Sequence, residues 1–283
     1  MRFINDSLRG ISILNHALRR MAKREIFRAK IAGISIEKNI GQRPFFVLQN
    51  PRTGSTFFLN CLNSYPNISF LADVLSPYSY FGIRRFFISK KALLDHVRRC
   101  LHYLEHPVCG VKIGFSHLKM HRMTLKDLSA EFPQAKWIVL YRKNILDQYI
   151  SHQIALRTQR WFQSPGDPYP ALEDVRIDLS PQSVLEYRNR ILRDYQSVLK
   201  NPEICSRSVW VSYEDIVVDS QKLFDEVIFP FMGLDRKNIG TRLMKQNIWQ
   251  YPEIIANYEE VGDFIEKTDF TLHYERYPDP LNP

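Results

Sequence analysis

The stretch from Phe45 to Thr56 reads FFVLQNPRTGST, an apolar run that leads through a turn into the start of a helix. The five residues at its beginning are bounded by proline-containing segments, and this pattern predicts a buried β-strand. Ser55 and Thr56 fall in the first turn of the helix that we expect to follow, where backbone N–H groups point outward with partial positive charge. Gly54 lets a ligand approach the backbone closely, and Arg52 adds a full positive charge. The stretch therefore predicts a loop that binds an anion.

Strands and helices are predicted to alternate along the rest of the chain. Further apolar runs predict strands at residues 68–71, 108–113, 136–141 and 208–212. Segments with helical spacing lie between and after these runs, at residues 90–105, 124–132, 145–160, 181–200 and 220–232. This alternation predicts an α/β fold, in which a parallel β-sheet is flanked by helices and ligands bind at the carboxyl ends of the strands.

Positive charge is concentrated at the start of the chain. The whole sequence has 39 basic and 30 acidic residues, a net charge of +9, and residues 1–43 contribute +7 of it. Apolar residues from Ile4 to Met21 recur at spacings of three and four, which predicts an amphipathic helix with a cationic face. We expect this helix either to pack on the main domain or to let residues 1–40 contact an anionic membrane surface or a partner. The rest of the chain, after residue 43, is nearly neutral, and this argues against a protein that coats nucleic acid.

Composition argues against several other classes of protein. With 45% apolar and 24% charged residues, the chain can bury a full core. No apolar run approaches the ~18 residues that a membrane span needs, and the N-terminus lacks the apolar stretch of a signal peptide. Four scattered cysteines, without a CxxC pair, argue against a zinc site or a disulfide scaffold. We therefore expect a cytoplasmic protein, or one held at the inner face of the membrane by its basic segment.

Three regions are expected along the chain. Residues 1–43 form a basic amphipathic helical extension, residues 44–265 form the α/β domain, and residues 266–283 form a C-terminal tail. The tail is set apart because it contains several prolines and little periodicity. The chemistry is therefore expected in the middle region, in the loops that follow its strands.

A second candidate anion site follows the apolar run at residues 136–141. Arg142 and Lys143 stand at the end of this predicted strand, and Ser151 lies about two turns into the helix that follows. An arginine and a hydroxyl group at the ligand edge of a sheet suit a terminal phosphate. Arg142 is favoured because it directly follows the strand, and Lys143 stays open as the alternative.

Two motifs resemble those of sulfotransferases that use 3′-phosphoadenosine 5′-phosphosulfate (PAPS). Residues 51–56, PRTGST, resemble their 5′-phosphosulfate loop, and residues 142–151 resemble their 3′-phosphate site. A Tyr-Glu-Asp stretch at residues 213–215 is also typical of the family, and the resemblance covers residues 43–261. It is strongest to bacterial carbohydrate and glycolipid sulfotransferases of the trehalose type, and it implies a sulfotransferase fold like that of P-loop kinases.

The resemblance implies that PAPS is the sulfuryl donor and that 3′-phosphoadenosine 5′-phosphate (PAP) is the product. No metal is implied, because the loop lacks the first glycine and the lysine of a Walker A sequence. Arg52 takes the place of the cation beside the bridging oxygen, where it would stabilise developing charge. The residues implied in donor binding are Arg52, Thr53, Gly54, Ser55, Thr56, Arg142, Ser151 and Lys245.

The base that removes the acceptor proton has several candidates. Asp73 lies 21 residues after Arg52, close to where similar carbohydrate sulfotransferases have a glutamate as base candidate. Cytosolic sulfotransferases of hormones instead use a histidine near mid-chain, so His117 and His121 stay open. Lys112, in a Gly-Val-Lys stretch similar to that of many bacterial members, is expected to face the sulfuryl group or the acceptor.

The sequence therefore predicts sulfuryl transfer from PAPS to a hydroxyl group of a carbohydrate, glycolipid or other small acceptor, by in-line attack with a carboxylate base. Two alternatives stay open: a nucleotide-dependent phosphotransferase similar to kinases, and a non-catalytic protein that binds a nucleotide or a membrane surface. The first of these normally needs a P-loop lysine, which this loop lacks. Neither the acceptor nor the oligomeric state is specified by these motifs.

Overall fold

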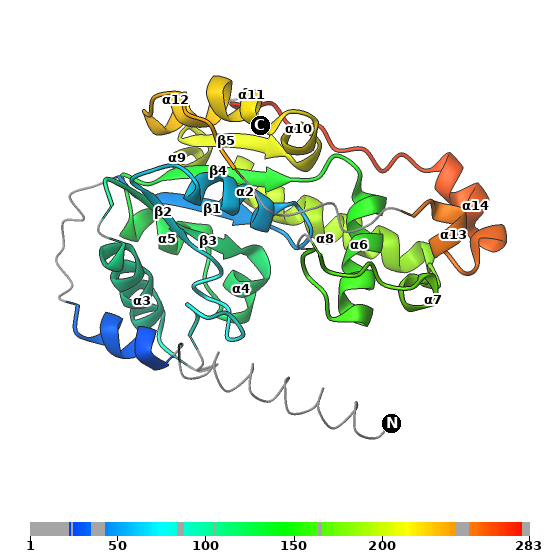
Figure 1. The fold of residues 1–283 in the computed structure, drawn as a ribbon, viewed down its shortest axis with the longest axis horizontal. Helices are drawn as coiled ribbons and strands as arrows, with labels where there is room; N and C mark the ends of the chain where they lie inside the picture. Colours follow the sequence, from blue (N-terminus) through cyan, green and yellow to red (C-terminus); the bar gives the residue numbers. More distant parts are fainter. Residues whose placement is uncertain are drawn as a thin grey trace.

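The computed structural model describes residues 23, 25–34, 43–83, 88–104, 106–163, 166–240 and 249–278. Within this part of the chain, five strands form one parallel sheet in the order β2–β3–β1–β4–β5 (Figure 1). The strands are β1 (Phe45–Gln49), β2 (Ile68–Leu71), β3 (Val108–Gly114), β4 (Lys136–Tyr141) and β5 (Ser208–Ser212). The predicted α/β fold with a parallel sheet is therefore confirmed, and each predicted strand is present.

Helices cover both faces of this sheet (Figure 1). They are α2 (Ser55–Asn63), α3 (Lys90–Tyr103), α4 (Phe115–Met120), α5 (Leu125–Glu131), α6 (Ile145–Thr158), α7 (Leu172–Val175), α8 (Pro181–Leu199), α9 (Pro202–Cys205), α10 (Tyr213–Val218), α11 (Ser220–Leu223), α12 (Phe229–Met232), α13 (Tyr251–Ile254) and α14 (Tyr258–Lys267). The helix predicted over residues 220–232 is present, and its middle turn, Phe224–Ile228, is π-helical. The shortest helices escaped prediction because one turn carries too little periodicity.

The sheet separates two apolar cores. Phe46 and Leu48 belong to the core that includes residues of α3, α5, α6 and α8. Phe45 and Val47 belong to the core that includes residues of α2 and α10–α12. This division follows because successive side chains of a strand point to opposite faces of the sheet. Every residue of β1 is buried, as expected for a central strand of a parallel sheet.

The central strand β1 also lies where the order of the strands reverses. Its hydrogen-bonded neighbours are β3 on one side and β4 on the other, and these strands follow each other in the sequence. The chain leaves the carboxyl end of β1 toward β2 on one side of the sheet and leaves that of the neighbouring β4 toward β5 on the other, and such a point is where open α/β sheets bind ligands. The anion loop predicted directly after β1 lies at this point.

The described part of the N-terminal region is a short helical segment at residues 25–32. Its Phe27 is buried and contacts the rings of Phe81 and Tyr103, which fastens the segment to the domain. The predicted amphipathic helix, residues 4–21, lies outside the described residues, and its contact with a membrane stays a prediction. In the ranges that the structure describes, no helix is long and apolar enough to cross a membrane.

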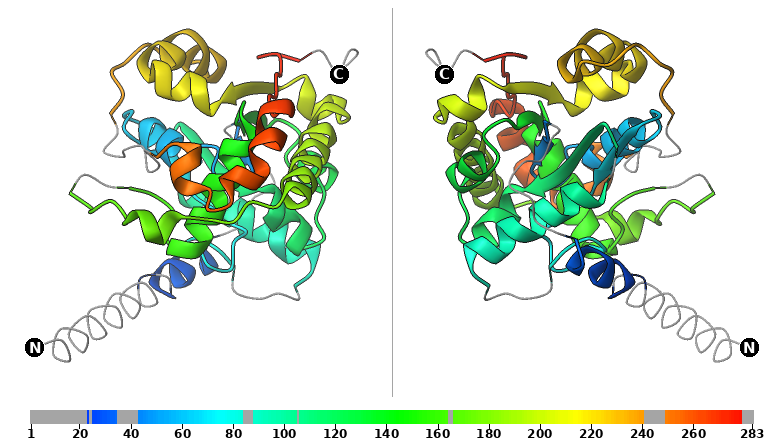
Figure 2. Two further views of the ribbon diagram at one scale, coloured as in Figure 1. Left: turned by 90° about the vertical axis from the view of Figure 1, so that its right-hand side faces the viewer. Right: turned by 90° about the vertical axis from the view of Figure 1, so that its left-hand side faces the viewer.

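The C-terminal segment packs on the α/β domain. Phe270 and Leu272 are buried in the larger core, and the ring centroid of Tyr274 lies 4.5 Å from that of Trp210. Ile145, the first residue of α6, donates its N–H to the carbonyl of Phe270. Figure 2 shows α13 and α14, in orange and red, alongside α6 and α7. The region boundaries expected from the sequence stay predictions.

Candidate active site

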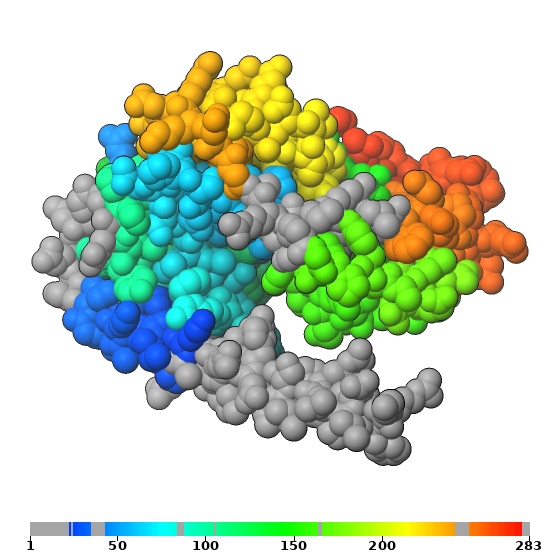
Figure 3. Space-filling model, viewed as in Figure 1, coloured from blue at the N-terminus to red at the C-terminus, as the bar shows by residue number. Residues whose placement is uncertain are grey.

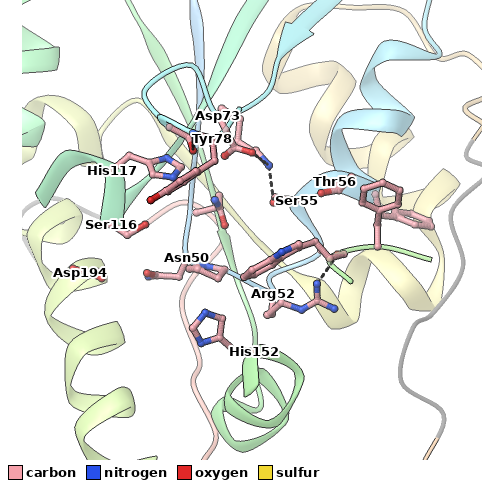
Figure 4. Close-up of a pocket in the computed structure, with 18 of the residues that line it drawn as sticks. Asn50, Arg52, Ser55, Thr56, Asp73, Tyr78, Ser116, His117, His152 and Asp194 are labelled. Atoms are coloured by element: carbon pink, nitrogen blue, oxygen red, sulfur yellow. Dashed lines mark hydrogen bonds and ion pairs between the residues drawn. The ribbon is translucent and has the colours of Figure 1, made fainter. Parts of the chain in front are cut away.

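A cavity of about 910 Å³ opens at the carboxyl ends of β1 and β3. Its wall joins segments that lie far apart in the sequence: the β1–α2 loop, the loop after β2, α4, α6 with the loop that follows it, and α8 (Figure 4). Figure 3 shows the segments around residues 55–80 and 145–175, in cyan and green, on one face of the molecule. The sequence-predicted residues that line this cavity are Arg52, Gly54, Ser55, Thr56, Asp73, Lys112 and His117.

The β1–α2 loop has the geometry that an anion site needs. Gly54 is the N-cap of α2 and has a left-handed backbone, with φ of 71°. A Cβ atom at this position would come within 2.5 Å of the ring of Tyr213, so only glycine fits both the backbone and the space. Ser55 and Thr56 follow in the first turn, where N–H groups have no acceptor within the helix. Thr53 is fully buried and donates its hydroxyl to the carbonyl of Asn50, so its side chain closes the turn.

Arg52 connects the two predicted phosphate motifs. Its Nε donates to Ser151 Oγ over 2.9 Å, and its guanidinium also donates to the carbonyl of Trp161. Burial, together with nearby Arg142, lowers the pKa of Arg52 to about 10, which still leaves the group charged at neutral pH. Arg142 and Ser151 do not line the cavity themselves. Ser151 is connected to the cavity by its hydrogen bond with Arg52, and Arg142 is close enough to lower the pKa of Arg52. The two motifs therefore form one connected positive region.

Arg142 and Lys143, the two candidates for the second phosphate, differ in their contacts. Lys143 turns its ammonium group to Asp215, with 2.7 Å between Nζ and Oδ1, and donates its N–H to Glu214. The guanidinium of Arg142 lies 4.7 Å from the ring centroid of Tyr213. Its buried Nε has no hydrogen-bond partner among the described residues, although Glu214 Oε1 lies 3.8 Å away. Arg142 also pairs with Asp147, with 3.3 Å between Nη2 and Oδ2, so both residues are in ion pairs, but of the two only Arg142 has a buried side-chain nitrogen without a hydrogen-bond acceptor among the described residues. The remaining donor-binding candidate, Lys245, lies outside the described residues.

Three site residues that were predicted from the sequence, each in or after a different strand, meet on the other side of the β1–α2 loop. Lys112 Nζ lies 2.9 Å from Asp73 Oδ2 and 3.4 Å from Ser55 Oγ. Lys112 is almost fully buried, and β3 continues for two residues beyond it, so the residue stands inside the strand and not at its end. Burial of the ammonium group is tolerated because Asp73 neutralises it. A cation, a carboxylate and a hydroxyl group of the anion loop therefore share one corner of the cavity.

The two histidines that the sequence left open have different surroundings. His117 lines the cavity, and its Nδ1 has no hydrogen-bond partner among the described residues. Burial lowers the pKa of His117, although Asp73 acts in the opposite direction, so the imidazole is neutral at pH 7. His121 instead directs Nε2 to the carbonyl of Leu75, 2.8 Å away. His117 thus remains a candidate base, whereas His121 holds the loop after β2.

A third histidine, not predicted from the sequence, holds the same loop. Nε2 of His96 lies 3.0 Å from the carbonyl oxygen of Val74 and 3.1 Å from that of Phe81. These two carbonyls lie near the two ends of the loop that carries Asp73. The backbone of Asp73 is left-handed, with φ of 52°. The buried imidazoles of His96 and His121 therefore fix the loop that places Asp73 in the cavity.

Several other cavity residues were missed by sequence reasoning. Burial, followed by the charges of Arg190 and Arg52, lowers the pKa of His152 to about 4. Asp194 of α8 pairs with Lys119 of α4, with 2.5 Å between Oδ1 and Nζ. Each of these residues is a single polar position in a helix, and no local motif marks it. Only the packing of α4, α6 and α8 around one space brings them together.

The chain is similar to several known proteins in sequence and in structure. No family model matches the chain. In sequence it is 24% identical over 242 residues to "Nodulation protein H" of Rhizobium meliloti, which covers 82% of this chain and 95% of that protein. In structure it is similar to the sulfotransferase domain of the Synechococcus PCC 7002 olefin synthase, with a TM-score of 0.47, 16% identity, and coverage of 88% of this chain and 96% of the other. It is also similar to a mouse sulfotransferase complexed with PAP, with a TM-score of 0.41, 12% identity, and coverage of 90% and 76%.

Proposed function

We propose that this chain is a sulfotransferase that moves a sulfuryl group from PAPS to a hydroxyl group of an acceptor. The observation that carries the proposal is the meeting of Arg52, Ser55, Lys112 and Asp73 in one cavity at the carboxyl end of β1. An anion-binding helix start, two cations and a candidate base are the groups that sulfuryl transfer needs. No single one of these groups is specific, but their combination matches this chemistry.

The residues present fit the two ends of PAPS. The start of α2, with the hydroxyl groups of Ser55 and Thr56, is suited to the phosphosulfate. A second phosphate fits the region of Arg142 and Ser151, where the buried Nε of Arg142 lacks a hydrogen-bond partner among the described residues. An unpartnered buried guanidinium nitrogen is costly unless a ligand supplies the acceptor. When bound, PAPS supplies the activated sulfuryl group.

In the proposed reaction, two cations of the protein stabilise charge and one base takes the acceptor proton. Arg52 and Lys112 flank the anion loop, where they would stabilise the negative charge that grows on the bridging oxygen. Asp73 or His117 would hold the proton of the acceptor hydroxyl, and both line the cavity. Asp73 has one carboxylate oxygen on Lys112, which leaves the other available to an acceptor, and His117 presents an unpartnered Nδ1.

The acceptor that fits this cavity is a carbohydrate, a glycolipid or another small hydroxyl compound. A volume of about 910 Å³ is within the usual range for small-molecule sites. Residues 1–40 would bring a membrane-borne acceptor close if the basic segment contacts the inner face of a membrane.

The direct test is calorimetric titration of the purified chain with PAP, with ATP as the control and without added metal. We expect PAP to bind at least about tenfold more tightly than ATP, because the 3′-phosphate adds charge-assisted hydrogen bonds. Binding of ATP equal to that of PAP would favour a kinase-like protein. Binding of PAP without any transfer to an acceptor would favour a non-catalytic nucleotide-binding protein.

Replacing Arg142 with Ala is expected to weaken PAP binding by about 2 kcal/mol, or roughly thirtyfold in Kd, since a charge-assisted contact is lost. Lys143→Ala is the matched variant, because Lys143 is the neighbouring cation and its ammonium group pairs with Asp215. We expect its effect on the Kd of PAP, measured by the same titration, to be several times smaller. A larger effect from Lys143→Ala would mean that Lys143, and not Arg142, binds the phosphate.

A further inference from the structure

One wall of the cavity consists of polar side chains that are not part of the proposed donor site. Asp194 on α8, Asn50 at the end of β1 and His152 on α6 lie around the same part of the cavity, opposite the loop that carries Asp73 (Figure 4). Only 5% of Asp194 and 3% of Asn50 is exposed. Polar groups buried to this extent are normally hydrogen-bonded within the protein.

Several atoms of this wall have no such partner. Nδ2 of Asn50 and Nδ1 of His152 are buried without a hydrogen bond among the described residues, and so is Nδ1 of His117 on the neighbouring segment. Asp194 has Oδ1 on Lys119, which leaves Oδ2 as a further acceptor. The wall therefore offers both donors and acceptors to a ligand, within a few side chains of the anion loop.

The charge of the wall favours a neutral ligand. Asp194 is balanced by Lys119, and the imidazole of His152 is neutral because its pKa lies near 4. Arg190 adds one positive charge at the rim, where its guanidinium lies 4.8 Å from the ring centroid of Tyr187. The second carboxylate oxygen of Asp194 can only accept hydrogen bonds, which an anionic group does not donate, and a phenol or sterol would leave the buried polar atoms unpaired. Neutral hydroxyl groups satisfy both conditions.

Aromatic side chains stand at the mouth of the same cavity. Tyr78 is 84% exposed, Phe162 51% and Trp161 44%, and all three line the opening. Large aromatic groups with free faces are suited to stack on a ring that has an apolar face. The pyranose ring of a sugar has such a face, with hydroxyl groups around its edge.

We propose, on the basis of the proposed sulfuryl transfer, that Asp194, Asn50 and His152 form an acceptor subsite for the hydroxyl groups next to the one that is sulfated. Asp194 accepts a hydrogen bond from one of these hydroxyl groups, and Asn50 Nδ2 donates to another. Lys119 fixes the carboxylate, and the acceptor is a pyranose sugar unit. Asp194 is thus the residue that selects a sugar over a phenol or a sterol.

The experiment compares acceptors with radiolabelled PAPS: methyl glycosides, their monodeoxy analogues, short oligosaccharides, phenols and sterols. The wild-type chain is expected to sulfate glycosides, and to lose at least about tenfold in kcat/KM for the monodeoxy analogue that lacks the hydroxyl bound by Asp194. In Asp194→Asn, this discrimination is expected to shrink to about threefold or less, with the KM for PAPS and the Kd of PAP unchanged. Glu186→Gln, on the exposed side of α8, is the matched control and should behave as wild type.

A second variant tests the same subsite if Asp194→Asn does not fold. Lys119→Gln changes the half-exposed partner of the same ion pair, and we expect a smaller loss of discrimination in the same direction. The subsite is overturned if phenols or sterols are sulfated as efficiently as glycosides, or if Asp194→Asn slows every acceptor by the same factor. It is also overturned if a chain that binds PAP sulfates no glycoside. A chain that does not bind PAP would instead overturn the proposed function.

Discussion

Replacing Asp73 with Asn is expected to lower kcat by about 10²–10³-fold, because the variant cannot hold the proton that leaves the acceptor hydroxyl. Asparagine keeps the size of the side chain, and its carbonyl oxygen can still accept from Lys112, 2.9 Å away in the wild-type pair. The Kd of PAP should therefore change little. The measurement is the initial rate of sulfuryl transfer at saturating PAPS, together with calorimetric titration of PAP.

His117→Gln is the matched variant for this prediction, because His117 is the other candidate base in the cavity. If Asp73→Asn keeps full turnover and His117→Gln loses it, the base is His117. Since burial lowers the pKa of His117, the imidazole would stay neutral as the pH falls through 6.5. The acid limb of kcat/KM would then lie below pH 6.5. Full turnover in both variants would mean that neither residue removes the proton.

Replacing Arg52 with Ala is expected to lower kcat by about 10²–10³-fold, the scale of losing one preorganised group that stabilises developing charge. The variant also loses the hydrogen bonds from Arg52 to Ser151 and to the carbonyl of Trp161. The KM for PAPS should rise as well, since Arg52 contacts both phosphate regions. Steady-state kinetics with varied PAPS separate the two effects.

Arg52→Lys is the informative comparison. Lysine keeps the positive charge but not the planar fork that reaches Ser151 and Trp161 together. We expect a loss of turnover between those of wild type and Arg52→Ala. Because the pKa of Arg52 is near 10, its charge should not limit activity between pH 7 and pH 8. A kcat of Arg52→Ala close to that of wild type would remove Arg52 from the chemistry.

Much of the fold was predictable from local patterns. A strand such as β1 is a short apolar run between Pro44 and Pro51, and α8 begins after Ser180, whose side chain caps the helix, with Pro181 in its first turn. The anion loop was also predictable, because Gly54 and the two hydroxyl residues after it act within one turn. The helix at residues 220–232 was predicted as well, but its π-helical turn at Phe224–Ile228 was not, since helical spacing does not distinguish a π turn from an α turn.

The sequence by itself determined the sheet, the anion loop and the cation after β4, because strand periodicity, helix starts and glycine turns depend on neighbours in the chain. Only the tertiary structure decided that Asp73 pairs with Lys112, that Lys143 is held by Asp215, and that His121 holds a loop while His117 faces the cavity. It also placed Asp194 in the same cavity. The reason is physical: the contacts of Asp73, Lys143 and His121 join residues that are 39, 72 and 46 positions apart. They depend on the order in which the strands lie side by side, and no local pattern specifies that order.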